Sequence, residues 1–276
     1  MTTTLRPAGP EERHDDGTRA RRYDVCVNSR RVGGVRLATD AQFGAAAGRI
    51  ADLRIDPADR RRGRATVAAL AAEEVLRGWG CRQIELTVPA EAGAAVRLAA
   101  ALGYIERGRT LSKPLTEAPR LPEGSRDRPL SAGEYPAWRD AAVAEYVRTQ
   151  VAQGTSRDRA EEAARADHHA LLPDGAETPG QVLRLLVHGG TDVGHLWVAL
   201  GRPGQPGGYV VDVRVAPDHR GRGHGRTLML VAERISLAAG DAVLGLYVYA
   251  DNAPARRLYD SLGYRPAAYR LWKPVL

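Results

Sequence analysis

Apolar and polar positions follow two different periods along the chain, and these periods predict alternating strands and helices. Short runs rich in valine, isoleucine and leucine predict strands, whereas apolar residues spaced three or four apart predict helices. In the second half the predicted strands are Val182–Val187, Val193–Leu200, Tyr209–Val215, Val243–Tyr249 and Tyr269–Trp272. The predicted helices there are Tyr135–Gln153, Ser156–Leu172, a segment around Leu228–Ile235, and Ala253–Leu262.

The first half shows the same alternation with shorter, more alanine-rich elements. Residues 1–20 are polar and broken by prolines and glycines, which predicts a loose lead-in. Thr116–Arg128 is rich in proline and charge and predicts a linker. The predicted strands are Tyr23–Asn28, Val32–Ala38, Ile50–Ile55, Ile84–Val88 and Tyr104–Leu115, and the predicted helices are Arg64–Trp79 and Ala92–Leu102.

One stretch of the second half combines a strand, a glycine-rich loop and a helix. Pro217 and Asp218 end the strand, and Arg220-Gly221-Arg222-Gly223-His224-Gly225 follows. Glycines let the backbone turn its N–H groups toward a ligand. The free N–H groups and the positive dipole end of the following helix then favour an anion. The stretch therefore predicts a diphosphate-binding loop, with an ordinary tight turn as the alternative.

The same stretch occurs twice in the chain. A shift of 160 residues places Pro57-x-x-Arg60-Arg61-Arg62-Gly63-Arg64-Ala65 under the loop that begins at Pro217. The same shift superposes Leu102-Gly103-Tyr104 on Leu262-Gly263-Tyr264 and Lys113-Pro114 on Lys273-Pro274. A single offset over so long a stretch indicates a duplicated unit. We therefore expect a first domain at residues 1–115, a linker at 116–130 and a second domain at 131–276.

The second half carries a family motif. Arg-x-x-Gly-x-Gly/Ala after a strand, followed by Asn252 and by Ala255-x-x-Leu258-Tyr259-x-x-Leu262-Gly263-Tyr264, resembles the GNAT superfamily of acyl-CoA-dependent N-acetyltransferases. The resemblance covers residues 185–276 well and 22–115 less completely. It implies an α/β (α+β) fold with two tandem GNAT domains, each a mixed, mostly antiparallel twisted sheet flanked by helices. The tandem arrangement resembles mycothiol synthase, although the residues do not assign that substrate, and a monomer and a homodimer both stay open.

The resemblance also implies roles for individual residues. The exposed backbone of Val213, Arg214 and Val215 would pair with the pantetheine arm and thioester carbonyl of acetyl-CoA. Tyr259 would protonate the leaving sulfur, or would instead be a core aromatic of its helix. Asn252 would touch the pantetheine, cap the helix that it begins, or do both. The diphosphate would be held, mainly by backbone N–H groups, at Arg220, Gly221, Arg222, Gly223, His224, Gly225 and Arg226.

An acidic residue lies one position before the exposed backbone segment. Alternation along the strand is expected to place Asp212 on the face opposite Val211 and Val213. A carboxylate at that position could remove the amine proton, either directly or through water. The alternative is a charge pair with Arg214, so Asp212 is a candidate general base and not yet an assigned one.

Aromatic and imidazole side chains of the second half are weaker candidates. Trp197 and His195 lie on the neighbouring strand and could line the acceptor pocket, or could serve only in packing. His168 and His169 lie at a polar helix end, and we expect both at the surface.

The first half keeps the loop but lacks the residues to which the chemistry is assigned. Ala99 lies under Tyr259, and Ala92 lies under Asn252. The short polar start also leaves no room for the helix pair that opens a GNAT domain and walls its acceptor site. We therefore expect this half to be catalytically silent. Its loop is a candidate second CoA site, made of Arg60, Arg61, Arg62, Gly63, Arg64 and Ala65.

Net charge narrows the choice of partner. The formal charge of +7 comes almost entirely from arginine, because Lys113 and Lys273 are the only lysines. A basic balance suits nucleic acid or an anionic cofactor. The run Arg60–Arg62 falls inside a predicted anion loop, and the chain has no basic tail and no basic patch interleaved with aromatic residues. We therefore expect acetyl-CoA as the anionic partner and no nucleic-acid partner.

Cysteine and hydropathy patterns narrow the class further. Cys26 and Cys81 are the only cysteines, which is too few for a disulfide scaffold, and no Cys/His cluster has metal-ligand spacing. No apolar run approaches the ~18 residues of a membrane span. The first residues lack the apolar core of a signal peptide. We expect a cytoplasmic protein with no metal and no membrane partner.

These features predict an acyl-CoA-dependent N-acyltransferase. It would transfer the acetyl group of acetyl-CoA to a primary amine of a small molecule or peptide by direct attack in a ternary complex. A non-catalytic CoA-binding regulatory or scaffolding protein is an alternative, which the retention of Tyr259 and Asn252 disfavours. A protein- or tRNA-directed acyltransferase is a second alternative, suggested by the positive charge.

Overall fold

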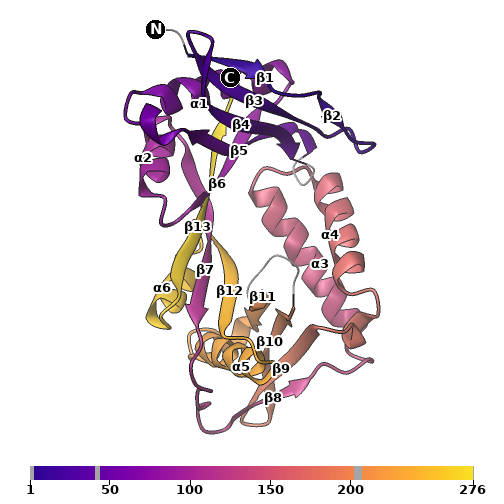
Figure 1. The fold of residues 1–276 in the computed structure, drawn as a ribbon. Coiled ribbons are helices and arrows are strands. Elements are labelled where there is room, and N and C mark those ends of the chain that lie inside the picture. The colour runs from indigo at the N-terminus through magenta and orange to yellow at the C-terminus, as the bar shows by residue number, and fades with distance from the viewer. Residues whose placement is uncertain (1–2, 41–43, 202–206, 276) are drawn as a thin grey trace. The chain divides into compact units, whose positions relative to one another are not determined.

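The computed structural model describes residues 3–40, 44–201 and 207–275. Its chain divides into two compact units. The first unit contains Met1–Arg109, Tyr249–Asp251 and Ala267–Leu276, and the second contains Thr110–Val248 and Asn252–Pro266. Each unit is built on strands with helices packed against them (Figure 1). The two units do not coincide with the two sequence repeats. Each repeat contributes much of its last strand, β7 (Ile105–Pro114) or β13 (Arg265–Pro274), to the other unit.

The sheet of the first unit is antiparallel except at one pair. Its strands follow the order β1 (Thr3–Pro7), β3 (Arg19–Val27), β4 (Arg30–Asp40), β5 (Gly44–Ile55), β6 (Gln83–Pro89) and the C-terminal part of β13 (Arg265–Pro274), with β2 (Glu12–Arg13) paired to β3. β5 and β6 are parallel. The helices α1 (Arg64–Gly78) and α2 (Gly93–Ala101) join these strands. Leu37, Leu76 and Ile84 are fully buried in the core that results.

Two segments that the sequence analysis assigned to irregular structure contain strands. β1 lies within the predicted lead-in and pairs with β3 from Thr3↔Val27 to Pro7↔Tyr23. β8 (Ser125–Pro129) lies within the predicted linker and pairs with β9. Both are edge strands held by backbone hydrogen bonds, so they need few apolar residues and leave a weak periodic signal.

The sheet of the second unit carries helices on both faces. Its strand order is β8, β9 (Gln181–His188), β10 (Thr191–Ala199), β11 (Gly208–Val215), β12 (Val243–Tyr249) and β7 (Ile105–Pro114). β11 and β12 are parallel, whereas β8, β9, β10 and β11 pair in antiparallel fashion. The helices are α3 (Tyr135–Ala152), α4 (Arg157–Leu171), α5 (His224–Ala238) and α6 (Ala253–Ser261). Residues 202–206, between β10 and β11, lie outside the described residues.

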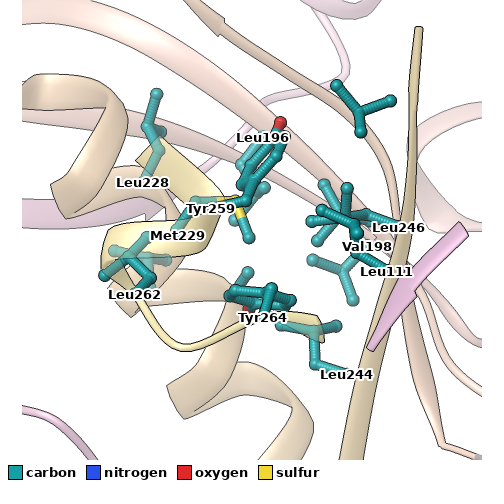
Figure 2. Close-up of a cluster of buried hydrophobic side chains, with 14 of the residues drawn as sticks. Leu111, Leu196, Val198, Leu228, Met229, Leu244, Leu246, Tyr259, Leu262 and Tyr264 are labelled. Carbon is teal, nitrogen blue, oxygen red and sulfur yellow. The ribbon is translucent and has the colours of Figure 1, made fainter. Parts of the chain in front are cut away.

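Alternate residues of β10 define the two faces. Leu196 and Val198 join the α5 and α6 core, where Leu228 and Met229 are also fully buried (Figure 2). Trp197 points the other way and joins the cluster formed with α3. Since neighbours along a strand face opposite sides of the sheet, the α3 face and the α5–α6 face are distinct. The candidate residues of β10 and β11 are therefore divided between these two faces.

The internal repeat is confirmed element by element. α1 and α5, β6 and β12, α2 and α6, and β7 and β13 each begin and end 160 residues apart. The short 3-10 turns Pro57–Asp59 and Pro217–His219 obey the same offset. The expected domain boundaries follow these repeats and stay a prediction.

A buried ion pair marks the place where β13 joins the first unit. The Nζ atom of Lys273 lies 2.8 Å from Oε2 of Glu73, and the Tyr104 hydroxyl donates to Oε1 of the same carboxylate at 3.0 Å. In the second unit Lys113 lies 2.7 Å from Glu233 in the equivalent arrangement. Each lysine thus reaches a glutamate that belongs to the other sequence repeat.

Candidate active site

Two parallel strands separate at the centre of the candidate site. β11 and β12 pair through Gly208–Val210 and Leu244–Leu246. Within the described chain this pairing does not continue past Val210, whereas β11 remains paired with β10 as far as Val215↔Gly194. The backbone of Val213–Val215 is therefore engaged on one side by β10 and lies beyond the end of the β12 pairing on the other.

The glycine-rich loop follows this strand and has the backbone of an anion cradle. Gly221 and Gly223 have φ angles of 76° and 84°, the left-handed region that only glycine adopts without strain. A Cβ added at either glycine would meet no atom within 4 Å, so the loop borders open space. Gly223 is the N-cap of α5, whose first N–H groups have no partner within the helix. The loop therefore fits a diphosphate group.

Some basic side chains of the loop form hydrogen bonds within the protein. The Arg220 guanidinium donates to the Val215 carbonyl at 3.4 Å, and Arg226 donates to the Ser261 hydroxyl on α6. His224 is buried with its ring centroid 4.9 Å from that of His188. Burial, followed by the charges of nearby histidines and an arginine, lowers the pKa of His224. Among the residues that the structure describes, no cluster of ligand side chains could hold a metal ion.

Tyr259 lies on α6 in the core of the second unit. Its side chain is buried beside Leu196, and its ring centroid lies 6.0 Å from that of Tyr264 (Figure 2). Burial, and then the charge of Asp212, raises the pKa of Tyr259 to about 12. The phenol is therefore protonated at neutral pH. Tyr259 packs in the core, its hydroxyl group is under the influence of the Asp212 charge, and its role as an acid stays a prediction.

Asn252 caps the helix that carries Tyr259. Its Oδ1 atom accepts a hydrogen bond from the Ala255 backbone N–H at 3.1 Å, which is the N-cap interaction. The expected cap is thus present. A contact with pantetheine stays a prediction.

A β-bulge sets the direction of Asp212. The β10–β11 register shifts between Trp197 and Val198, which leaves Val211 as the extra residue. Val211 packs in the α3 cluster and Val213 in the α5–α6 core. The expectation that both valines share the face opposite Asp212 is therefore wrong, because the bulge interrupts the alternation. Asp212 is the cross-strand partner of Trp197 and faces α3.

Asp212 forms a hydrogen bond with the histidine of the neighbouring strand. Nε2 of His195 lies 2.8 Å from Oδ2 of Asp212. Burial pushes the pKa of Asp212 up, but the hydrogen bond and charge of His195, and then the charge of Arg214, bring this pKa below its ordinary value. Arg214 lies 3.9 Å from Asp212 and 3.3 Å from Glu145 on α3. The structure thus brings Asp212 and His195 together and gives Arg214 a second acidic neighbour.

Three rings cluster beside this pair on the α3 face. The Trp138 ring of α3 lies 6.0 Å from His195 and 5.7 Å from Trp197, edge-on to both. Trp197 donates from Nε1 to Gln181 at 2.6 Å. His168 lies 5.5 Å from Trp197 and is half-buried, so the expectation of a surface position is wrong for this residue. Most neighbours of His168 on α4 are exposed and some are charged, so the sequence pattern does not show that His168 lies on the side of the helix that turns inward.

Sequence reasoning missed the contributions of α3 and α4 to the site. The helix Tyr135–Gln153 was predicted, but neither Trp138 nor Glu145 was singled out as a site residue. The helical period shows which side of α3 is buried but not what it is buried against. A tryptophan on that face was the one available signal.

The loop of the first repeat keeps the backbone of the second. Arg61 and Gly63 have φ angles of 58° and 72°, close to those of their counterparts Gly221 and Gly223. The loop borders a cleft of about 1020 Å³ whose wall includes Ala99, the residue in the place of Tyr259. The cleft opens where β5 and β6 cease to pair, after Arg49↔Glu85.

Arg64 does not turn toward this cleft as a free cation. It is buried and paired with Asp59, which Arg30 also contacts at 2.8 Å. Backbone N–H groups and the exposed arginines are therefore the parts of the loop that can meet an anion.

Comparison with known proteins gives a consistent result. The model of the acetyltransferase (GNAT) family matches residues 3–104 and 139–264. A mycothiol acetyltransferase from Saccharomonospora viridis is 32% identical over 227 residues, which cover 78% of this chain and 70% of that protein. No helix of the described chain is long and apolar enough to cross a membrane.

Two solved structures share the architecture across most of the chain. A GCN5-related N-acetyltransferase from Sphaerobacter thermophilus has a TM-score of 0.61 at 20% identity and covers 92% of this chain and 80% of its own. A tandem GNAT protein from the clavulanic acid biosynthesis pathway has a TM-score of 0.53 at 22% identity, with 94% and 84% covered. These likenesses show the fold, and the family model shows the family. The chain belongs to the GNAT family of acetyltransferases and carries two GNAT repeats in tandem.

Proposed function

We propose that the protein transfers the acetyl group of acetyl-CoA to a primary amine of a small molecule or peptide by direct attack in a ternary complex. The observation that carries this proposal lies in the second unit, where an anion cradle, an unpaired strand edge and a buried phenol meet. A mycothiol acetyltransferase among the relatives supports a small-molecule acceptor. The basic net charge keeps a protein or tRNA acceptor as the alternative.

The donor would be held by backbone groups of the second repeat. The loop from Arg220 to Arg226 would bind the diphosphate, and the edge of Val213–Val215 would bind the pantetheine arm and the thioester carbonyl. Both are main-chain contacts, which are placed by the fold before the ligand arrives and so need little reorganisation. Acetyl-CoA supplies the activated acyl group.

The two proton transfers of the reaction would involve residues on opposite faces of the sheet. Tyr259, on the α5–α6 side, would protonate the departing sulfur, and its raised pKa keeps a proton available at neutral pH. Asp212, on the α3 side, would help to remove the amine proton. The acceptor would then approach along the face that Trp197 and His195 occupy.

The first unit is a candidate for a second, non-catalytic CoA site. Its loop, from Arg60 to Ala65, shares the left-handed backbone positions of the active copy and borders the large cleft. It lacks the phenol, because Ala99 replaces Tyr259. The first unit would therefore bind the carrier without turnover.

A thiol-release assay tests the proposed function. Purified protein is incubated with acetyl-CoA and a panel of amines: glucosamine, spermidine, an amino-acid methyl ester and a tripeptide with a free N-terminus. We expect amine-dependent release of CoA for at least one class. Tyr259→Phe should lower the rate, whereas the matched control Tyr146→Phe on α3 should not. Release that is the same with and without every amine would contradict the proposal.

A further inference from the structure

His195 and Asp212 form a pair at the acceptor face of the proposed site. They come from neighbouring strands and share one face of the sheet, because the pair Leu196↔Val213 separates His195↔Arg214 from Trp197↔Asp212. Their side chains are 18% and 26% exposed, so both are sheltered yet reachable. The hydrogen bond of 2.8 Å between Nε2 and Oδ2 leaves the other ring nitrogen, Nδ1, outside the pair.

The charge of Asp212 fixes which nitrogen carries the proton. An ionised carboxylate can only accept hydrogen bonds, so Nε2 of His195 must be the donor. In the neutral ring Nδ1 then has a free lone pair. The hydrogen bond and charges around Asp212 hold its pKa below the ordinary range, against the effect of burial. A carboxylate held in this way is a weak base, whereas imidazole is the side-chain group that titrates nearest to neutral pH.

We propose that His195 accepts the proton of the attacking amine and that Asp212 is the positioning residue that holds its tautomer and orientation. This assignment rests on the proposed acetyl transfer and deepens it.

Packing restrains the imidazole in the orientation that this role needs. The ring planes of Trp138 and His195 meet at 87°, with their centroids 6.0 Å apart. Trp138 is itself held against Trp197 at 75°, and Trp197 is anchored by its hydrogen bond to Gln181. A catalytic group whose ring is already fixed by packing and a carboxylate loses little entropy on reaching the reactive arrangement.

The remaining charged groups around the pair come from four elements. On β11, Arg214 lies between Asp212 and Glu145, and Glu145 projects from α3. On α4, burial lowers the pKa of His168, which keeps that ring neutral near pH 7. On α6, Tyr259 is neutral for the reason given above. Asp212 is therefore the carboxylate that His195 contacts directly.

The reaction balances with these groups alone. The amine nitrogen forms a bond to the thioester carbonyl carbon, and the carbon–sulfur bond breaks. The nitrogen gives its proton to Nδ1 of His195, and the sulfur receives a proton from Tyr259. His195 then releases a proton to solvent and Tyr259 regains one, so that no electron is gained or lost.

The first repeat offers an internal comparison. Asp52 occupies the position of Asp212, since the two lie 160 residues apart. Gly34 pairs with Arg54 as His195 pairs with Arg214, so a glycine stands in the place of the histidine. Ala99 stands in the place of the tyrosine. The first repeat, which lacks the tyrosine, thus retains the aspartate as Asp52 but has no histidine at the position of His195.

Three variants test the assignment by their pH profiles. His195→Gln can still donate to Asp212 but cannot accept a proton, so kcat/KM should fall at least about 100-fold and lose its acid limb. Asp212→Asn keeps the imidazole, so the acid limb should remain while kcat/KM falls about 10-fold or more. His169→Gln, on the exposed side of α4, should match the wild type. The KM for acetyl-CoA should stay within about 3-fold in all three.

The opposite result is as clear. An acid limb that persists in His195→Gln and vanishes in Asp212→Asn would make Asp212 the base and overturn the proposal. A wild type that acetylates none of the amines would instead remove the proposed function, and with it any proton acceptor for that reaction.

A measurement that needs no catalytic activity distinguishes a failure of the His195 assignment from a failure of the proposed function. ¹⁵N NMR of histidine-labelled protein, assigned with His195→Gln, reports the tautomer of His195 directly. We expect the proton on Nε2 in the wild type, and a mixture of tautomers in Asp212→Asn. A wild-type proton on Nδ1 would overturn the assignment, whichever amine is the acceptor.

Discussion

Replacing Lys273 by methionine tests how β13 is held in the first unit. Methionine keeps most of the apolar stem of the lysine but removes the ammonium group. Glu73 then stays buried, with 8% of its side chain exposed, and retains only the Tyr104 hydroxyl as a neighbour in this cluster. The carboxylate loses its cationic partner in a place where water can reach it only poorly.

The expected cost follows from the burial of the two partners. Removing one partner of a buried ion pair costs about 3–5 kcal/mol, because an uncompensated charge is left behind. The Lys273 side chain is 25% exposed, and the Tyr104 hydrogen bond persists, so the lower end applies. We expect Lys273→Met to lower the free energy of unfolding by about 3 kcal/mol.

Urea unfolding followed by circular dichroism measures this loss. Lys113→Met is the matched variant, because its ammonium group lies 2.7 Å from Glu233 and its side chain is 24% exposed, close to the 25% of Lys273. The two losses should agree within about 1 kcal/mol. Adding Glu73→Leu to Lys273→Met should recover much of the stability, since the unpaired charge is removed. A loss below about 1 kcal/mol in Lys273→Met would refute the reasoning, because a buried unpaired carboxylate must cost more than that.

Four further predictions concern the site and its helices. Tyr259→Phe should lower kcat about 100-fold with the KM for acetyl-CoA little changed, measured by steady-state kinetics. Gly223→Val should raise the KM for acetyl-CoA, because a β-branched residue resists the left-handed backbone at the N-cap of α5, while circular dichroism stays that of the wild type. Asn252→Ala should cost about 1 kcal/mol of stability in urea, through loss of the cap hydrogen bond. The pKa of His168 is lowered by burial, so the unfolded chain binds a proton first on acidification. Stability should therefore fall as the pH drops below about 6.5 and level off below the folded pKa. The slope of Tm against pH should be smaller in His168→Gln and unchanged in His169→Gln.

The sequence was sufficient for features that depend on local chemistry. The loop around Gly221 and Gly223 was predicted because glycine spacing, the preceding valines and the following helical period all lie within one short stretch. The cap at Asn252 was among the alternatives for the same reason, and the structure contains it. The repeat was predicted because its elements keep one offset, and the structure reproduces that offset at both ends of α1 and α5.

Features that depend on distant pairing could not be predicted. The last strands of the two repeats have similar patterns, so the sequence does not tell which sheet each one joins. Trp138 and Trp197 lie far apart in the chain, so the sequence does not show that their rings are in contact. The bulge at Val211 arises from a register shift between two strands, and an alternation rule applied to one strand alone cannot detect it.

The most direct test of the central claim is a crystal structure of the protein with CoA bound. The account predicts the diphosphate of CoA against the backbone N–H groups of the loop from Gly221 to Gly225. It also predicts the pantetheine arm along the edge of Val213–Val215. A second molecule in the first unit would be compatible with this. A structure in which CoA is bound elsewhere and the second-repeat loop contacts no part of it would contradict the account.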